Sequence, residues 1–299
     1  MPTTTRIRAR PIGHGLSARL PGSLAGLFRR PRVQAAVAAA QRGSLLRPTA
    51  RFVLEELSGR HNTRTYELRQ AGLKVVLEHG SPDVLTFDEV FCQQLYAPPT
   101  PIAAALASLG RPPRVLDIGA NVGLFGAYAQ CRWPGALVRG FEPDPRNAAI
   151  HRASIAANRA GANWRLQQAA AAARTGTLAF SAGRYALSRP AAEGEADALE
   201  VPAIDVLPLL AEADLLKLDA EGSEWAILGD SRFACAAPRA IALEYHPELC
   251  PEQDARGAAV RLLETAGFAV ADVQTRSPRG YGSLWAWRSA AANETQSRA

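Results

Sequence analysis

Short apolar runs alternate with longer alanine-rich or amphipathic stretches from about residue 101 onward. Continuous apolar runs of this length are typical of strands buried in a parallel sheet, and the stretches between them are typical of helices. The predicted strands are 114–118, 136–141, 164–171, 177–181, 199–204, 215–218, 240–245, 268–273 and 283–287. The predicted helices are 122–131, 145–160, one from about residue 223, and 251–266. This alternation predicts a doubly wound, mostly parallel α/β domain.

Two stretches interrupt the alternation. Residues 182–198 are small and polar with glycine and proline interruptions, which predicts a mobile loop. Residues 277–280 are rich in turn formers and separate the last two predicted strands. These two strands could therefore form an antiparallel hairpin at the edge of the sheet.

The chain before residue 101 has a different pattern. Residues 52–80 alternate around Tyr66 and Val75, which predicts a β-hairpin with Gly72 in its turn, and residues 88–96 suggest a short helix. The sequence therefore predicts a basic, disordered tail over 1–50 with one alanine-rich helix near 33–42, a small α+β extension over 51–100, the main domain over 101–289, and a second tail over 290–299.

Charge does not point to a nucleic acid. The 299 residues carry a formal net charge of +6, which could favour an anionic partner. The first fifty residues hold nine arginines and no acidic residue, however, so the remainder of the chain is mildly acidic. Basic and aromatic residues do not interleave as they do on RNA-binding surfaces. We therefore expect no nucleic-acid partner.

Composition also bears on the cellular setting. A hydrophobic content of 47% is enough for one sizeable core, but no apolar run reaches the roughly 18 residues that a membrane helix needs. The four cysteines are too scattered for a zinc site or a disulfide framework. We therefore expect no stable membrane insertion and a cytoplasmic location.

The stretch after the first predicted strand of the main domain predicts a ligand site. In an open α/β sheet, ligands bind beyond the carboxyl ends of the strands. Gly119 can turn the chain there, and Gly123 lets a ligand approach the backbone at the helix N-terminus. A dinucleotide would need G-x-G-x-x-G, but Asn121 and Leu124 stand where the second and third glycines belong. A nucleotide-cofactor oxidoreductase is therefore disfavoured.

The same site suits S-adenosylmethionine, which carries no phosphate. Asp117, before the glycine turn, suits the ammonium group, and Glu142, at the end of the second strand, can accept hydrogen bonds from both ribose hydroxyls. The residues predicted to bind this cofactor are Asp117, Gly119, Asn121, Gly123 and Glu142.

Four segments together resemble FkbM-type methyltransferases, which are class I, S-adenosylmethionine-dependent enzymes. They are RVLDIGANVGLFGAYA, GFEPDPRNAAIHRASIAAN, LLKLDAEGSEWAILG and ALEYHPEL, and the short VPAID segment also fits. The similarity spans about residues 65–287. It implies a seven-stranded, Rossmann-like sheet and methyl transfer, usually to an oxygen of a sugar, glycolipid or polyketide-type natural product.

The third segment carries acids that could act on the acceptor. A hydroxyl nucleophile must lose its proton, either to a positioned base or with the help of a metal ion. Asp219 is the first candidate for orienting or deprotonating the acceptor, Glu221 the second and His246 the third. Glu224 is better explained as an acid at a helix N-terminus. A metal held by the three candidates is possible, but their spacing does not require one, and we predict none.

The leading prediction is therefore an S-adenosylmethionine-dependent methyltransferase acting on a hydroxyl of a small-molecule or glycan acceptor. The alternative is a non-catalytic S-adenosylmethionine-binding or scaffold protein that keeps the fold without turnover. The presence of the acids Asp117, Glu142 and Asp219 argues against such a loss of catalytic activity.

Overall fold

The computed structural model of the chain describes residues 31–183, 188–191, 195, 198–236, 238–272 and 280–288. The chain divides into two compact units, Met1–Leu95 and Tyr96–Ala299. The expected tails at 1–30 and 290–299, and parts of the expected loop at 182–198, lie outside the described residues.

The first unit contains the predicted hairpin. Strands β2 (Asn62–Leu68) and β3 (Lys74–His79) pair antiparallel, and Gly72 lies in the turn with a φ of 66°. The other elements of the unit are α2 (Pro31–Gly43), β1 (Leu46–Arg47), α3 (Thr49–Ser58), α4 (Asp83–Phe87) and the π-helical turn η2 (Asp88–Cys92). The helix expected at 88–96 is instead a helical segment that begins at Asp83 and ends at Cys92.

Residues 31–50, which the composition assigns to a tail, are folded. The alanine-rich helix is present as α2, and β1 adds a third strand to the hairpin through the Leu46–Leu68 pairing. Leu46 and Phe52 are fully buried, and the Phe52 ring packs edge-on against Tyr66. This buried apolar contact explains why the unit extends further toward the N-terminus than charge alone suggests.

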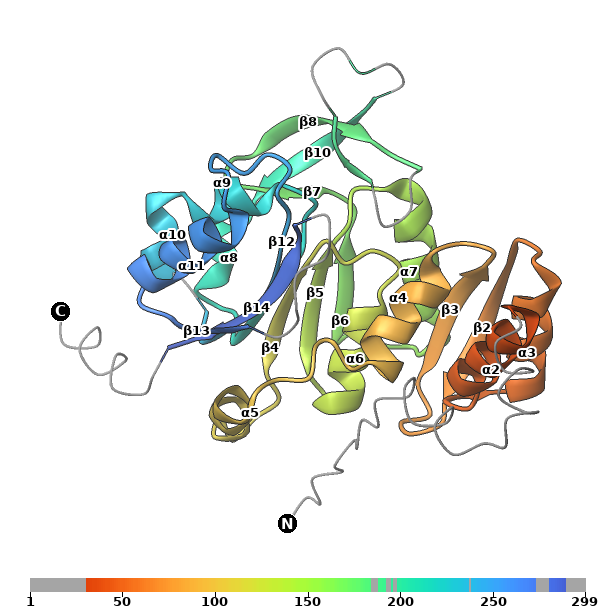
Figure 1. Ribbon diagram of the computed structural model, residues 1–299. Coiled ribbons are helices and arrows are strands. Elements are labelled where there is room, and N and C mark those ends of the chain that lie inside the picture. The colour runs from red at the N-terminus through yellow and green to blue at the C-terminus, as the bar shows by residue number, and fades with distance from the viewer. Residues whose placement is uncertain are drawn as a thin grey trace, which may run out of the picture. The chain divides into compact units, whose positions relative to one another are not determined.

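The second unit is built on a seven-stranded sheet with the order β13-β14-β12-β11-β4-β5-β6 (Figure 1). The strands are β4 (Arg114–Ile118), β5 (Leu137–Phe141), β6 (Trp164–Gln167), β11 (Leu215–Leu218), β12 (Ala240–Tyr245), β13 (Ala269–Asp272) and β14 (Gly282–Trp287). The run from β12 to β6 is parallel, whereas β14 pairs antiparallel with both β12 and β13. The sheet is therefore mixed, and the last two strands do form an antiparallel pair at its edge.

Helices cover both faces of this sheet (Figure 1). They are α5 (Thr100–Ala107), α6 (Leu124–Arg132), α7 (Pro145–Ala157), α8 (Leu207–Leu210), α9 (Glu224–Leu228), α10 (Ser231–Ala236) and α11 (Ala255–Thr265). On the face covered by α8 to α11, Leu116, Leu216 and Leu243 form one apolar core with side chains of those helices. Because strand side chains alternate, the neighbouring residues Asp117 and Lys217 point to the other face.

A separate small sheet departs from the prediction. The run expected as one strand at 164–171 divides into β6 and β7 (Ala170–Ala172), because the chain turns after Gln167. Strand β7 then joins β8 (Gly176–Ser181), β9 (Arg189–Pro190) and β10 (Leu199–Asp205) in a four-stranded sheet with the order β7-β10-β8-β9. Its own small core contains Phe180 and Val201.

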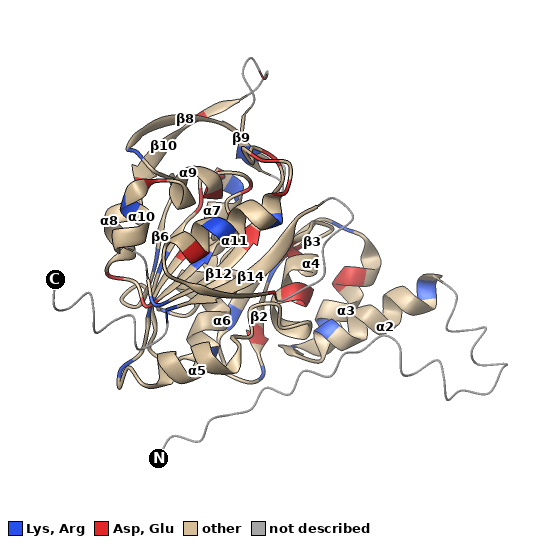
Figure 2. Ribbon diagram, turned by 60° about the vertical axis from the view of Figure 1, so that its left-hand side comes forward, with Lys and Arg blue, Asp and Glu red and all other residues tan. Residues whose placement is uncertain are grey.

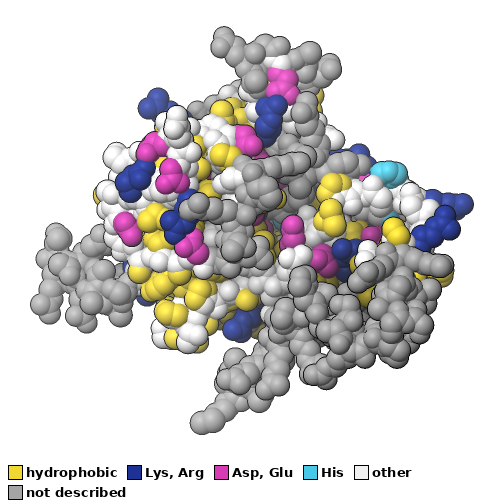
Figure 3. Space-filling model, in the orientation of Figure 1, with side chains coloured by type: hydrophobic (Ala, Val, Ile, Leu, Met, Phe, Trp, Pro, Cys, Tyr) yellow, Lys and Arg dark blue, Asp and Glu magenta, His cyan; other side chains and the backbone are white. Residues whose placement is uncertain are grey.

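Charge is dispersed over the described surface. Basic and acidic residues are interspersed along the ribbon (Figure 2), and one face of the molecule shows hydrophobic, basic and acidic side chains side by side (Figure 3). Among the described residues, no helix combines the length and the apolar character needed to cross a membrane.

Candidate active site

The register of the sheet brings the two predicted cofactor-binding acids to one face. Asp117 of β4 lies beside Lys217 of β11 and beside Gly140 of β5. Because side chains alternate along a strand, Glu142, two residues after Gly140, points to the same face as Asp117. Both carboxyl groups therefore lie on one side of the sheet, near the carboxyl ends of adjacent parallel strands.

Asp117 is fully buried and has unused hydrogen-bonding capacity. Neither of its carboxylate oxygens accepts a hydrogen bond from any described residue, and the nearest cation, Lys217 Nζ, lies 3.8 Å from Oδ1. Burial raises the pKa of Asp117 to about 6, the charge of Asp219 adds to this effect, and Lys217 opposes it. A buried acceptor without a donor is costly, so this site favours a ligand that donates.

Glu142 is buried but well oriented. Its Oε2 accepts the backbone N–H of Asn121 at 2.8 Å, and its Oε1 accepts the backbone N–H of Asp144 at 2.8 Å. Burial raises the pKa of Glu142 to about 7, although both backbone donors favour the ionised form. Each oxygen keeps a second lone pair for another donor.

The turn between these acids depends on two glycines. Gly119 has a φ of 72°, and a Cβ at this position would lie 1.6 Å from the backbone oxygen of Asp219. Gly123 has a φ of 87°, and its Cβ would lie 2.5 Å from the ring of His151. The ends of β4 and β11 therefore approach as closely as they do because residue 119 has no side chain.

Lys217 connects the acids of β4 and β11. Its Nζ donates to the backbone oxygen of Gly119 at 2.6 Å and lies 3.0 Å from Asp219 Oδ2. Burial alone would lower the pKa of Lys217, but the carboxylates of Asp219 and Asp117 outweigh it and raise this pKa. Lys217 is thus a buried ion-pair partner of Asp219 and Asp117.

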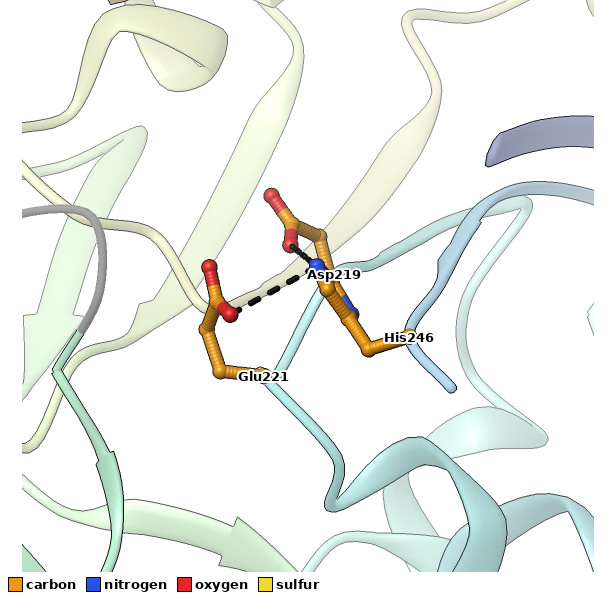
Figure 4. Close-up of side chains that lie close together, drawn as sticks. All are labelled: Asp219, Glu221 and His246. Atoms are coloured by element: carbon orange, nitrogen blue, oxygen red, sulfur yellow. Dashed lines mark ion pairs between the residues drawn. The ribbon is translucent and has the colours of Figure 1, made fainter. Parts of the chain in front are cut away.

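The three predicted acceptor-handling residues lie together (Figure 4). Nε2 of His246, which follows β12, is 3.9 Å from Asp219 Oδ1 and 3.6 Å from Glu221 Oε2. Glu221 has a φ of 49°, a left-handed conformation that costs a residue with a side chain about 1–2 kcal/mol. Asp219 and Glu221 are partly exposed, whereas His246 is buried, so the carboxylates face an accessible space.

Glu224 has a role that its position in the sequence does not reveal. It is completely buried, and its Oε1 accepts both the backbone N–H of His246 and a hydrogen bond with His246 Nδ1, each at 2.9 Å. Its Oε2 accepts the backbone N–H of Gly222 at 2.8 Å. Burial alone would lower the pKa of His246, but Glu224, Asp219 and Glu221 raise it instead. Glu224 therefore fixes the orientation of the His246 ring.

We expect Glu224→Ala to lower the free energy of unfolding by about 3 kcal/mol or more, because buried donors without partners cost about 1–3 kcal/mol each. Urea unfolding followed by fluorescence measures this change. Glu248→Ala is the control, because Glu248 is exposed nearby, and it should stay within about 0.5 kcal/mol of wild type. Equal stabilities of the two variants would refute the role assigned to Glu224.

Asp144 is a second residue that the sequence does not single out. It caps the N-terminus of α7 through the backbone N–H groups of Arg146 and Asn147. Its other carboxylate oxygen accepts hydrogen bonds from Gly183 N–H and Ser188 Oγ. Asp144 thereby connects the residues after β8 to the turn that follows Glu142.

Comparison with known proteins identifies the family. Residues 117–270, about half of the chain, match the family described as the methyltransferase FkbM domain. The acid-bearing strand ends described above lie within this range, and β14 (Gly282–Trp287) lies beyond it. The chain therefore belongs to the FkbM methyltransferase family and is an S-adenosylmethionine-dependent methyltransferase.

Several solved structures match the chain at low sequence identity. Methyltransferase FkbM from Methylobacillus flagellatus KT is 12% identical, covers 85% of this chain and 59% of its own, and has a TM-score of 0.41. Magnesium protoporphyrin IX methyltransferase from Synechocystis PCC 6803 is 18% identical, with 66% and 79% covered and a TM-score of 0.41. The O-methyltransferase TomG from Streptomyces achromogenes is 15% identical, with 64% and 82% covered and a TM-score of 0.38. The search of curated proteins gave no match.

Proposed function

We propose that this protein transfers a methyl group from S-adenosylmethionine to a hydroxyl oxygen of a sugar, glycolipid or natural product. One observation carries the proposal. A buried pair of carboxyl groups, Asp117 and Glu142, shares a face of the sheet, and the Asp219–Glu221–His246 cluster follows the two next strands, β11 and β12. All five residues belong to the unit Tyr96–Ala299.

The first group of residues suits the methyl donor. The oxygens of Asp117 lack donors among the described residues, so they can receive the ammonium group, directly or through water. Glu142 is held by two backbone N–H groups and can still accept hydrogen bonds from two ribose hydroxyls. Gly119, Asn121 and Gly123 form the turn that lets the ligand approach the backbone.

The second group suits the acceptor. When bound, S-adenosylmethionine supplies a sulfonium methyl that is displaced in line, so that a carbon–oxygen bond forms as the carbon–sulfur bond breaks and its electron pair returns to sulfur. The acceptor hydroxyl must lose its proton in this step. Asp219 is partly exposed and can orient the hydroxyl and accept that proton, while Glu221 and His246 lie beside it.

Two measurements test the proposed function. Calorimetric titration with S-adenosylhomocysteine should give a dissociation constant in the micromolar range or below, and titration with NADH should give no heat. Labelled methyl groups from S-adenosylmethionine should then appear on hydroxyl acceptors in a panel of glycans, glycolipids and polyketides. Flat titrations of folded protein with S-adenosylhomocysteine would overturn the assignment. Binding without methylation across a broad panel would favour the scaffold alternative.

Cofactor affinity should depend on pH through Glu142. Because burial raises the pKa of this carboxyl to about 7 and ribose hydroxyls donate to its ionised form, S-adenosylhomocysteine should bind more tightly as pH rises. Binding to the ionised form alone predicts about a tenfold gain from pH 6 to pH 8. Calorimetry at several pH values measures this, and Glu142→Gln should bind more weakly with most of the slope lost. An unchanged slope in Glu142→Gln would exclude this origin.

A further inference from the structure

We propose that Asp219, Glu221 and His246 form a binding site for one divalent first-row metal ion, which would hold the acceptor oxygen. The inference rests on the proposed function, because it assigns the ion to the same acceptor site. The spacing of these residues in the sequence does not require a metal. The arrangement of their side chains supplies the argument.

The distances between the ligand atoms suit a shared ion. One oxygen of each carboxylate and one nitrogen of His246 all lie within 4.8 Å of one another. The Nε2 atom lies 3.6 Å from Glu221 Oε2 and 3.9 Å from Asp219 Oδ1, which is too far for hydrogen bonds. Ligands bound at about 2.1 Å lie roughly 3 Å apart at right angles and about 4.2 Å apart across the ion. The two distances from His246 Nε2 fall within that range.

The state of the His246 side chain is a second, independent observation. It is 6% exposed, and its Nε2 atom is directed at the carboxylates of Asp219 and Glu221, at ion-pair distances beyond the reach of a hydrogen bond (Figure 4). Its Nδ1 is held by the buried Glu224. Histidines that bind metals typically use one ring nitrogen for the ion while a carboxylate fixes the other. His246 is held in this way.

The surrounding charge also favours a cation. Glu244 Oε1 lies 4.0 Å from His246 Nε2, so three carboxylates besides Glu224 surround this nitrogen. The nearby cation Lys217 is already shared between Asp219 and Asp117. A divalent ion bound at Nε2 would take the place of the proton that these carboxylates favour on His246, and it would offset more of their negative charge.

The donor set indicates the kind of metal and its use. Carboxylates suit Mg²⁺ and Mn²⁺, and imidazole suits first-row transition metals, so one nitrogen with two carboxylates favours Mn²⁺ or a similar ion. Such an ion would act as a Lewis acid on the acceptor hydroxyl. The O–H bond would then break, its proton would pass to the Asp219 carboxylate as in the proposed function, and the oxygen electron pair would form the bond to the methyl carbon.

Direct binding of Mn²⁺ to the full chain tests the site without any acceptor. Electron paramagnetic resonance of free Mn²⁺ should show about one ion bound per chain. We expect Glu221→Gln and His246→Asn each to weaken this binding at least tenfold, as loss of a ligand should. Glu252→Gln is the matched control, because Glu252 is an exposed acid paired with Arg261, and its Mn²⁺ affinity should equal that of wild type.

The two proposals fail separately. Absence of Mn²⁺ binding, or equal binding by wild type and Glu221→Gln, would overturn the metal site even if S-adenosylhomocysteine binds normally. Absence of S-adenosylhomocysteine binding to folded wild-type protein would instead contradict the proposed function. Circular dichroism shows whether His246→Asn is folded, so that a loss of Mn²⁺ binding is not mistaken for unfolding. Glu221→Gln provides an independent variant, because the Glu221 side chain is partly exposed and its replacement should not disturb folding.

Discussion

Replacing Asp219 by asparagine is expected to lower kcat by about 10²- to 10⁴-fold while leaving the affinity for S-adenosylhomocysteine within about threefold of wild type. The amide has nearly the same size as the carboxylate. It cannot accept the proton of the acceptor hydroxyl, and it binds a cation far more weakly. The loss should therefore appear in turnover and not in binding of the methyl donor.

The environment of Asp219 makes the separation of these two effects plausible. Its Oδ2 lies 3.0 Å from Lys217 Nζ, and Lys217 also donates to the Gly119 carbonyl, a hydrogen bond that does not involve Asp219. Glu142 is held independently by Asn121 and Asp144. The proposed cofactor site should consequently keep its geometry in Asp219→Asn.

Asp272→Asn is the control for this experiment. It makes the same carboxylate-to-amide change at an exposed position on β13, where Asp272 pairs with Arg256. Methyl transfer is measured with the best acceptor found in the panel, and S-adenosylhomocysteine affinity by calorimetry. A kcat for Asp219→Asn close to that of Asp272→Asn would remove Asp219 from the proposed mechanism. A parallel loss of S-adenosylhomocysteine binding would place it in the cofactor site instead.

The central strands could be read from the sequence because apolar residues dominate them. The predictions at 215–218 and 240–245 coincide with β11 and β12. Strands buried on both faces carry mostly apolar residues, and a single polar residue inside each, Lys217 in β11 and Glu244 in β12, does not hide the pattern. The same reasoning misjudged 164–171, because an apolar run does not show where a chain leaves one sheet and joins another. That depends on pairing with β10, which lies some thirty residues later.

The sequence predicts site residues that lie at the ends of strands, but it does not predict contacts between residues far apart in the chain. Asp117 and Glu142 share a face because β4 and β5 are adjacent and parallel, with Asp117 opposite Gly140 and Glu142 two residues further on. Glu224 looks like an acid that complements a helix dipole, and α9 does begin with it. Its actual partner, His246, is 22 residues away on another strand end. No local pattern contains that information.

Gly119 is expected to be the most sensitive backbone position in the unit Tyr96–Ala299. A Cβ there would lie 1.6 Å from the backbone oxygen of Asp219, a distance that requires the ends of β4 and β11 to move apart. A left-handed φ adds about 1–2 kcal/mol for any residue with a side chain. We expect Gly119→Ala to lower the free energy of unfolding by more than about 4 kcal/mol, which is at the extreme for single substitutions.

Gly110→Ala separates the conformational cost from the steric one. Gly110 has a φ of 66°, and a Cβ there would meet nothing within 4 Å, so this variant should lose only about 1–2 kcal/mol. All five tryptophans belong to the same unit, so urea unfolding followed by fluorescence reports on it. Equal losses in the two variants would show that β4 and β11 can separate at little cost. Because Asp219 follows β11 and Asp117 lies in β4, the two carboxylates would then lack a fixed separation, and the donor and acceptor sites would lose the rigid frame that in-line transfer needs.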